Sequence, residues 1–239
     1  MYNTDKFVEG LKSLNIELSD NQMNQFLKYY EMLVEKNKVM NLTAITEFDE
    51  VIEKHFLDSL QIAQYVDINN KDISLIDVGT GAGFPGVPLK IAFPNIKVVL
   101  LDSLNKRINF LNEVIEVLGL ENIAALHGRA EDYGKDPEYR EQFDYCVSRA
   151  VANMCSLSEY CLPFVKVGGS FIPYKSGNID EELVNAKKAV FLLGGKIDKV
   201  EKFVLEENQR SFVFIKKEKN TGKKYPRKAG LPTKEPLGR

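Results

Sequence analysis

One stretch of the sequence decides the fold, Asp77-Val78-Gly79-Thr80-Gly81-Ala82-Gly83-Phe84-Pro85-Gly86. It follows a short apolar run, Ile73 to Val78, that is typical of a buried parallel strand. It precedes a predicted helix that runs through Ala92 and tolerates Pro88 in its first turn. Glycines let the backbone turn tightly and let a ligand approach where a Cβ would collide. Strand, glycine loop and helix in this order predict a nucleotide-type binding loop.

Beyond the loop, apolar runs typical of strands alternate with helical periodicity. Further strands are predicted at 97–101, 123–126, 143–147 and 170–172, and helices at 108–118, 154–164 and 180–193. Two last alternating runs, 196–205 and 211–217, are joined by a polar connection that is typical of a hairpin. A βαβ series closed by a hairpin predicts a doubly wound α/β fold with a seven-stranded sheet and an antiparallel last strand.

The chain divides into three predicted parts. Residues 1–70 form an N-terminal helical subdomain, in which Ser19 caps a helix with apolar residues at steps of three and four and a polar break follows at 37–46. The turn-rich segment Asn69-Asn70-Lys71-Asp72 marks the boundary to a ligand-binding domain at 71–219. Residues 220–239 form a basic C-terminal tail.

Composition limits the class of protein. Of the 239 residues, 44% are apolar and 28% charged, so a sizeable core can form. The sequence shows neither an apolar run of the ~20 residues that a membrane span needs nor a secretory signal. Three cysteines without CxxC spacing and two histidines without metal-ligand spacing argue against a disulfide framework and a metal site. We therefore expect a cytoplasmic protein that binds no metal or membrane.

The ligand of the loop is either a dinucleotide or S-adenosylmethionine. Asp102 ends the next strand, 21 residues after Gly81, where a carboxylate can accept hydrogen bonds from ribose hydroxyls. Asp77 stands just before the first glycine, where it would attract a cationic methionine end but repel a pyrophosphate. The spacing of Gly79, Gly81 and Gly83 and the closing hairpin also favour S-adenosylmethionine, so the sequence resembles a class I methyltransferase over about residues 72–217.

Five motifs in order give a closer resemblance to one family. They are His55-Phe56-Leu57-Asp58-Ser59-Leu60, the glycine loop with Phe84-Pro85-Gly86, Leu101-Asp102-Ser103 with Lys106-Arg107, Gly128-Arg129-Ala130-Glu131 and Ser148-Arg149-Ala150. Together they resemble the bacterial 16S ribosomal RNA guanine-N7 methyltransferases, the RsmG or glucose-inhibited-division-protein-B family, over almost the whole chain. The resemblance implies cofactor contacts at Gly79, Phe84, Ala130, Glu131 and Arg149, with Asp102 as the ribose-binding acid.

A basic end on an acidic body indicates contact with nucleic acid. Residues 216–239 hold nine Lys/Arg and two acids, a local net charge of +7, whereas the whole chain carries −2. Cations can pair with phosphates and a ring can stack on a base. Predicted RNA contacts in the tail are Lys223, Lys224, Tyr225, Arg227 and Lys228. Further predicted contacts at the rim of the site are Lys106, Arg107, Arg129 and Lys175.

The expected reaction needs no general base, because guanine N7 already carries an in-plane lone pair. Arg149 is the predicted orienting residue, with 16S ribosomal RNA in the small subunit or an assembly intermediate as partner, while the roles of His55 and Asp58 stay open. Cys146 lies inside a predicted strand and indicates a core position rather than a nucleophile. The alternatives are a small-molecule methyltransferase, an NAD-dependent oxidoreductase, and a cofactor-binding RNA-associated module without catalysis.

Overall fold

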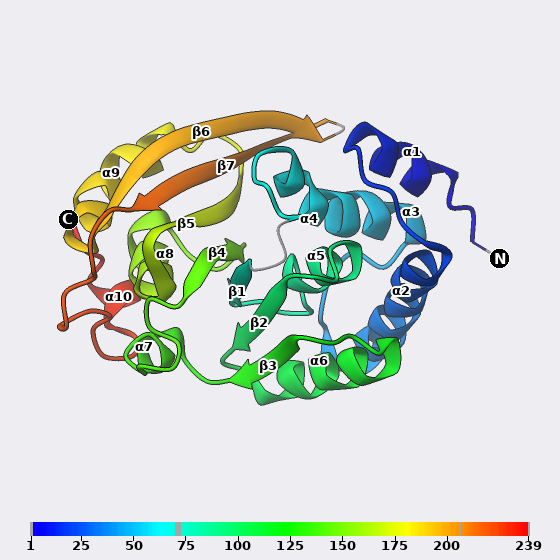
Figure 1. Cartoon of the computed structure of the whole chain (residues 1–239), viewed down its shortest axis with the longest axis horizontal. Coiled ribbons are helices and arrows are strands. Elements are labelled where there is room, and N and C mark those ends of the chain that lie inside the picture. The colour runs from blue at the N-terminus through cyan, green and yellow to red at the C-terminus, as the bar shows by residue number, and fades with distance from the viewer. Residues whose placement is uncertain (1, 70–72, 206, 239) are drawn as a thin grey trace.

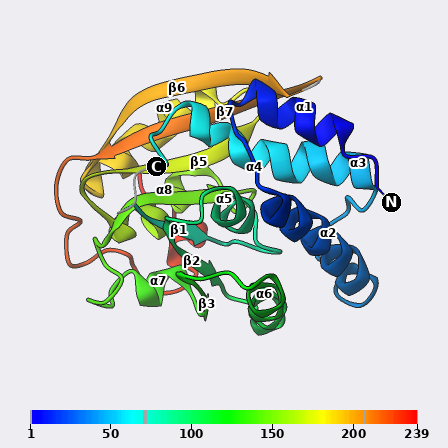
Figure 2. The same ribbon diagram turned by 45° about the vertical axis from the view of Figure 1, so that its right-hand side comes forward.

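A computed structural model describes residues 2–69, 73–205 and 207–238. A seven-stranded sheet forms its central layer, in the order β3-β2-β1-β4-β5-β7-β6 (Figures 1 and 2). The strands are β1 (Ser74–Val78), β2 (Lys97–Asp102), β3 (Ile123–His127), β4 (Phe143–Arg149), β5 (Val165–Ser176), β6 (Gly195–Leu205) and β7 (Asn208–Lys217). The first five pair in parallel, and β7 runs antiparallel to both β5 and β6. This confirms the predicted fold class.

The N-terminal part is helical, as predicted. It contains α1 (Asp5–Ser13), α2 (Asp20–Met40), and a continuous helical stretch made of α3 (Phe48–Val51), η1 (Ile52–Leu57), α4 (Asp58–Leu60) and η2 (Gln61–Gln64). Ser19 and Gln22 form a capping box that starts α2, which satisfies two otherwise unpaired N–H groups. The helix α2 extends four residues into the predicted polar break, to Met40, and its C-cap residue Asn41 has a left-handed conformation. The predicted boundary residues 70–72 lie outside the described residues.

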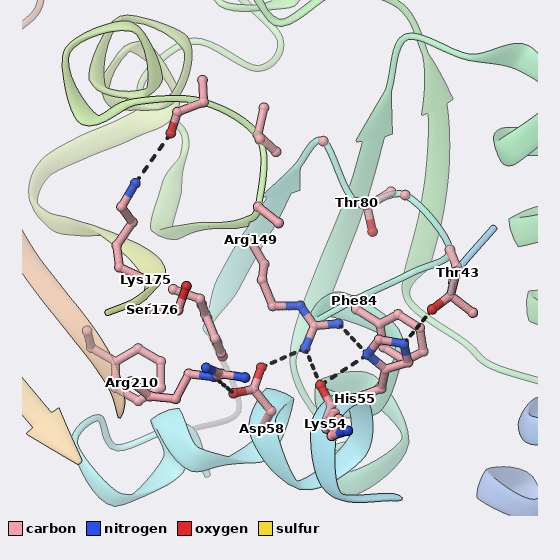
Figure 3. Close-up of a pocket in the computed structure, with 18 of the residues that line it drawn as sticks. Thr43, Lys54, His55, Asp58, Thr80, Phe84, Arg149, Lys175, Ser176 and Arg210 are labelled. Atoms are coloured by element: carbon pink, nitrogen blue, oxygen red, sulfur yellow. Dashed lines mark hydrogen bonds and ion pairs between the residues drawn. The ribbon is translucent and has the colours of Figure 1, made fainter. Parts of the chain in front are cut away.

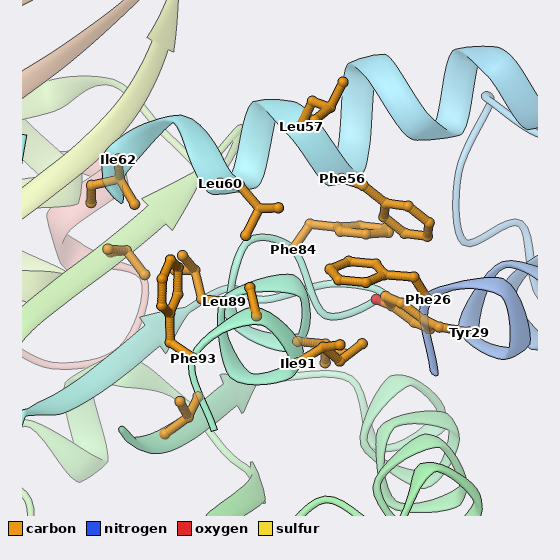
Figure 4. Close-up of a cluster of buried hydrophobic side chains, with 14 of the residues drawn as sticks. Phe26, Tyr29, Phe56, Leu57, Leu60, Ile62, Phe84, Leu89, Ile91 and Phe93 are labelled. Atoms are coloured by element: carbon orange, nitrogen blue, oxygen red, sulfur yellow. The ribbon is translucent and has the colours of Figure 1, made fainter. Parts of the chain in front are cut away.

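Alternate residues of each strand point to opposite faces, so the sheet separates two apolar clusters. Leu75 and Leu100 face the first cluster, whereas Ile76 and Leu101 face the second. The first cluster is covered by the N-terminal helices, α5 (Gly86–Ala92) and α6 (Asn105–Leu118). Figure 4 shows Phe26, Tyr29 and Phe56 of the N-terminal helices beside Phe84. The second cluster is covered by α8 (Met154–Cys161), η3 (Leu162–Phe164) and α9 (Asp180–Leu192).

Two details differ from expectation. The predicted Gly168-Gly169 turn lies inside β5, where the register with β4 shifts between Phe143 and Tyr145. The predicted hairpin connection at 206–210 is shorter, because β7 already begins at Asn208, and Glu206 lies outside the described residues. Two short helices, α7 (Ala130–Tyr133) and α10 (Leu231–Lys234), follow β3 and β7 respectively. Among the described residues, no helix has the length and apolar character that a membrane crossing requires.

Candidate active site

Two adjoining cavities lie where the parallel strands end. The first cavity, of about 620 Å³, is lined by residues from the η1–α4 stretch, the glycine loop, β4, β5 and β7. The second, of about 460 Å³, is lined by residues that follow β1, β2 and β3 and by residues near the C-terminus. Gly79, Arg107, Ala150 and Val151 line both cavities, so the two are neighbours at the glycine loop. Ligands of doubly wound sheets bind at this edge.

Only part of the predicted glycine cradle faces the cavities. Gly79 and Gly81 line the first cavity with φ of 73° and 62°, values that L side chains rarely adopt. A Cβ on Gly81 would meet nothing within 4 Å, whereas one on Gly79 would lie 2.5 Å from a Val151 methyl group. Gly83 instead packs against the N-terminal helices, since a Cβ there would lie 2.7 Å from the hydroxyl oxygen of Tyr29. Gly83 therefore permits close packing with Tyr29 and lines neither of the two cavities, and its cofactor contact stays a prediction.

Asp77 supports the glycine loop through hydrogen bonds and lines neither of the two cavities, and its predicted interaction with a methionine end stays a prediction. The side chain is fully buried, and its Oδ2 accepts hydrogen bonds from the Thr80 hydroxyl at 2.7 Å and the Gly86 N–H at 2.9 Å. Burial raises the pKa of Asp77 to about 6. Its Oδ1 is buried without a hydrogen-bond partner among the described residues. Asp77 thus holds the glycine loop in place from the buried side of the loop, through Thr80 and Gly86.

The second cavity holds two carboxylates at adjacent strand ends. Asp102 accepts hydrogen bonds from the Gly81 N–H at 3.0 Å and the Leu104 N–H at 2.9 Å, and pairs with Arg107 at 3.1 Å. Glu131, in the first turn of α7, lines the same cavity next to Ala130 and is only 5% exposed. The structure therefore brings Asp102, Ala130 and Glu131 together, as the sequence predicted. Two acceptor groups beside a glycine turn suit the ribose and base of a nucleoside.

The first cavity is built around Arg149, which ends β4 (Figure 3). Its guanidinium donates to Asp58 Oδ2 at 2.7 Å, lies 3.3 Å from His55 Nδ1, and stands 5.1 Å above the centre of the Phe84 ring. His55 stacks on the same ring with centroids 4.5 Å apart. Burial, followed by the charge of Arg149, lowers the pKa of His55 to about 3. A neutral histidine therefore lies beside a fixed guanidinium.

Sequence reasoning left Asp58 open and missed Arg210. Asp58 is buried and accepts hydrogen bonds from both arginines, with Arg210 Nε at 3.2 Å from its Oδ1. The three side chains come from α4, β4 and β7, so their spacing in the sequence gives no signal for the cluster. The one available signal was the quoted His55–Leu60 motif, which contains an acid in a largely apolar helix. Asp58 therefore positions the Arg149 guanidinium.

Two tail residues that were predicted to contact RNA make contacts within the protein, Tyr225 as a buried ring and Arg227 as a half-buried ion-pair partner. The Tyr225 ring is only 6% exposed in the second apolar cluster, so it cannot stack on a base in this structure. Arg227 forms an ion pair with Glu159, in which its NH2 group lies 2.7 Å from the fully buried Glu159 carboxylate. The predicted stacking of a base on Tyr225 is therefore wrong, because the tail folds back on the body and buries the ring. The RNA contact of Arg227, whose side chain is 21% exposed, stays a prediction. The tail lysines Lys223, Lys224 and Lys228 are exposed.

The predicted rim cations lie at different depths. Lys106 and Arg129 are exposed, and Arg129 lines the second cavity. Arg107 lines both cavities. Lys175 lines the first cavity and pairs with Glu182 at 2.8 Å. Their contact with RNA stays a prediction.

The side chains of the second cavity fit a nucleoside cofactor. Gly81 leaves open space beside the Asp102 carboxylate, and Glu131 faces the same cavity. Within residues 2–69, 73–205 and 207–238, no group of three or more His, Cys, Asp or Glu side chains is placed to hold a metal ion. Cys146 is fully buried in β4, as predicted for a core residue.

Comparisons with known proteins identify a family by sequence and a shared fold by structure. Residues 22–213 match the GidB family model, described as rRNA small subunit methyltransferase G. A ribosomal RNA small subunit methyltransferase G of Lachnoclostridium phytofermentans is 54% identical over 99% of this chain and 98% of its own length. The protein of the same name from an Exiguobacterium species is 52% identical over 98% of this chain and 99% of its own. Among solved structures, M. jannaschii TYW2 in complex with AdoMet matches 63% of this chain and 73% of its own with a TM-score of 0.52 and 15% identity, which shows a shared fold.

Proposed function

Because the chain belongs to the GidB family of small-subunit rRNA methyltransferases, we propose that it transfers a methyl group from S-adenosylmethionine to N7 of a guanine in 16S ribosomal RNA. One observation carries the proposal for this particular chain. A cavity lined by five cations (Lys54, Arg107, Arg149, Lys175 and Arg210) and only two carboxylates (Asp58 and Glu182) adjoins the nucleoside-type cavity. A cationic cavity suits a polyanionic acceptor better than a neutral small molecule.

The two cavities would bind the two reactants, the cofactor in the second cavity and the acceptor nucleotide in the first. When bound, S-adenosylmethionine supplies a methyl group on a positively charged sulfur. Asp102 and Glu131 would hold its nucleoside end in the second cavity, and the open space at Gly81 would admit it close to the backbone. The first cavity would then hold the acceptor nucleotide, with Phe84 and Arg149 as one wall.

Catalysis by these residues is mainly orientation. Guanine N7 presents a lone pair in the ring plane, so no proton has to leave before the methyl group is transferred. Asp58 fixes the Arg149 guanidinium, and His55 stays neutral beside it, which keeps the wall of the cavity in one arrangement. Holding both reactants in line supplies much of the rate gain without a general base.

The acceptor state and location are also proposals. N7 lies on the major-groove edge of guanine, which A-form RNA makes inaccessible to side chains, so the target guanine would be unpaired or locally opened. We place it in the small ribosomal subunit or an assembly intermediate, and therefore place the protein in the cytoplasm.

A methyl-transfer assay tests the proposal. The full chain is incubated with isotopically labelled S-adenosylmethionine and either naked 16S ribosomal RNA or intact small subunits, and the modified base is mapped by its chemical cleavage and mass. We expect one N7-methylguanine in at least one of the two substrates. Calorimetry with S-adenosylhomocysteine and NAD provides the control for the oxidoreductase alternative. Binding of NAD in preference, or a methyl group on another atom or only on small molecules, would overturn the proposal.

A further inference from the structure

The C-terminal strap, residues 220–238, is an ordered part of the body. It leaves β7, crosses α8 and ends beside α9 (Figure 1). Thr221, Tyr225 and Pro232 are buried along its course. Arg140 donates to the carbonyl oxygens of Thr221 at 2.5 Å and Tyr225 at 2.8 Å. These contacts tie the first half of the strap to the protein.

A buried ion pair pins the middle of the strap. Glu159 on α8 is fully buried and accepts hydrogen bonds from the Arg227 backbone N–H at 2.8 Å, from Nε at 2.9 Å and from NH2 at 2.7 Å. The same NH2 group donates to the Glu235 carbonyl oxygen at 2.7 Å, which closes the strap into a loop around Arg227. A planar fork with several donors matches a carboxylate in a way that a lysine ammonium does not.

The loop closed by this pin forms one wall of the second cavity. Gly230 and Thr233 line the cavity together with Asp102 and Glu131. The Gly230 N–H donates to Glu131 Oε1 at 2.9 Å, from a backbone with φ of 81°. The Thr233 hydroxyl lies 2.6 Å from that of Tyr160, which lines the same cavity. One side of the nucleoside cavity therefore comes from the last residues of the chain.

We propose that the C-terminal strap is a wall of the cofactor cavity, and that the Arg227–Glu159 pair is the positioning pair that holds Gly230 against Glu131. The strap thereby fixes the rotamer of Glu131 and encloses the nucleoside end of the ligand. This inference rests on the proposed function, since it takes the second cavity as the S-adenosylmethionine site. It assigns the strap to cofactor binding, and the ion pair acts through Gly230 without touching the ligand.

Two truncations form a matched pair that tests the wall. Removal of residues 229–239 takes away Gly230 and Thr233 but keeps Tyr225 and Arg227. Removal of residues 236–239 keeps Gly230, Thr233 and the Glu235 carbonyl group. Calorimetry with S-adenosylhomocysteine should show at least about a tenfold loss of affinity for the first truncation and less than twofold for the second, because a hydrogen bond to a charged group disappears only in the first.

A pair of substitutions tests the role of the Arg227–Glu159 ion pair. Arg227→Lys keeps the charge but loses the fork, and Lys228→Arg makes the reverse exchange at an exposed neighbour. We expect a several-fold loss of S-adenosylhomocysteine affinity for Arg227→Lys only, with circular dichroism confirming that both variants are folded. In the unaltered chain, saturating S-adenosylhomocysteine should also slow trypsin cleavage after the exposed Lys228 and Lys234 several-fold.

The outcomes separate the two proposals. If the unaltered chain fails to bind S-adenosylhomocysteine, the proposed function fails. If it binds the ligand, and the 229–239 truncation is folded and binds with unchanged affinity, the strap is not a wall of the cavity. Equal trypsin cleavage with and without ligand would lead to the same rejection.

Discussion

The neutral state of His55 predicts how the stability of the protein depends on pH. The measurement is simple because the sequence contains only two histidines. His55 lies between the Phe84 ring, the Arg149 guanidinium and the Thr43 hydroxyl, which is 2.9 Å from Nε2. Burial lowers its pKa to about 3, from an ordinary value of 6.5, and the charge of Arg149 acts in the same direction. The folded protein therefore binds fewer protons at this site than the unfolded chain does.

The sign and size of the effect follow from this difference. A depressed pKa in the folded state gives stability that is present above pH 6.5 and is lost as the pH falls toward 3. Each pH unit inside that window is equivalent to about 1.4 kcal/mol. Between pH 6.5 and 4.5, protonation of His55 in the unfolded chain alone should therefore lower the free energy of unfolding by roughly 2–3 kcal/mol.

The perturbation is His55→Gln, which stays neutral at every pH. Urea unfolding of the ligand-free protein, followed by circular dichroism from pH 4.5 to 8, gives the free energy of unfolding for both chains. The variant should be less stable at pH 8, because it loses the stack on Phe84. Below pH 6.5, however, its curve should fall less steeply than that of the unaltered chain. His127→Asn, at an exposed position, is measured in parallel as the control substitution.

Nuclear magnetic resonance provides the direct readout. The chain has only His55 and His127, so two ring signals can be followed, and the His127→Asn variant assigns them. We expect the His55 signal to stay in its neutral position down to the lowest pH at which the protein is folded. Titration of His55 near pH 6.5, or parallel stability curves for the unaltered chain and His55→Gln, would refute the reasoning.

Three further predictions concern the site and the strap. Arg149→Lys should lower methyl transfer at least tenfold while S-adenosylhomocysteine affinity changes less, because an ammonium cannot bridge Asp58 and the ring of Phe84 as the guanidinium does; full activity would show that charge alone suffices. Asp102→Ala should weaken S-adenosylhomocysteine binding by about 1.5–3 kcal/mol in calorimetry, and an unchanged affinity would remove it from the cofactor cavity. Tyr225→Ala should lower the free energy of unfolding by about 3–5 kcal/mol in urea unfolding, because it removes a large aromatic side chain from a core. A loss of RNA affinity without a loss of stability would contradict the buried position of Tyr225.

The sheet could be predicted because its signals are local. Strand β1 and the glycine loop carry their own pattern, an apolar run followed by residues that tolerate positive φ. Asp102 was found for the same reason, since a carboxylate at the end of a parallel strand lies at the ligand edge whatever the rest of the chain does. Ala130 and Glu131 follow the same rule after β3. These residues could be placed from periodicity, spacing and the family resemblance together.

The loop showed where a local pattern stops being informative. Gly79, Gly81 and Gly83 occur at the same two-residue spacing, so the sequence does not distinguish their roles. Gly83 nevertheless packs against Tyr29, which lies in α2, more than 50 residues earlier in the chain. Asp77 similarly has the right position for a ligand contact, but its carboxylate is used by Thr80 and Gly86. The spacing determined that the loop exists, whereas packing decided which of its groups the cavity exposes.

Ion pairing between distant segments was decided by the tertiary structure alone. The basic composition of the tail indicated a phosphate partner for Arg227, but its partner is Glu159, a buried acid 68 positions earlier in the chain. Asp58 likewise meets Arg149 and Arg210 across 91 and 152 positions. The sequence by itself determined the doubly wound sheet, the glycine turn and the acids at the strand ends, because backbone conformation and side-chain alternation depend on neighbouring residues. It did not determine which charges meet, because a cation pairs with whichever carboxylate the completed fold brings to it and shields from water.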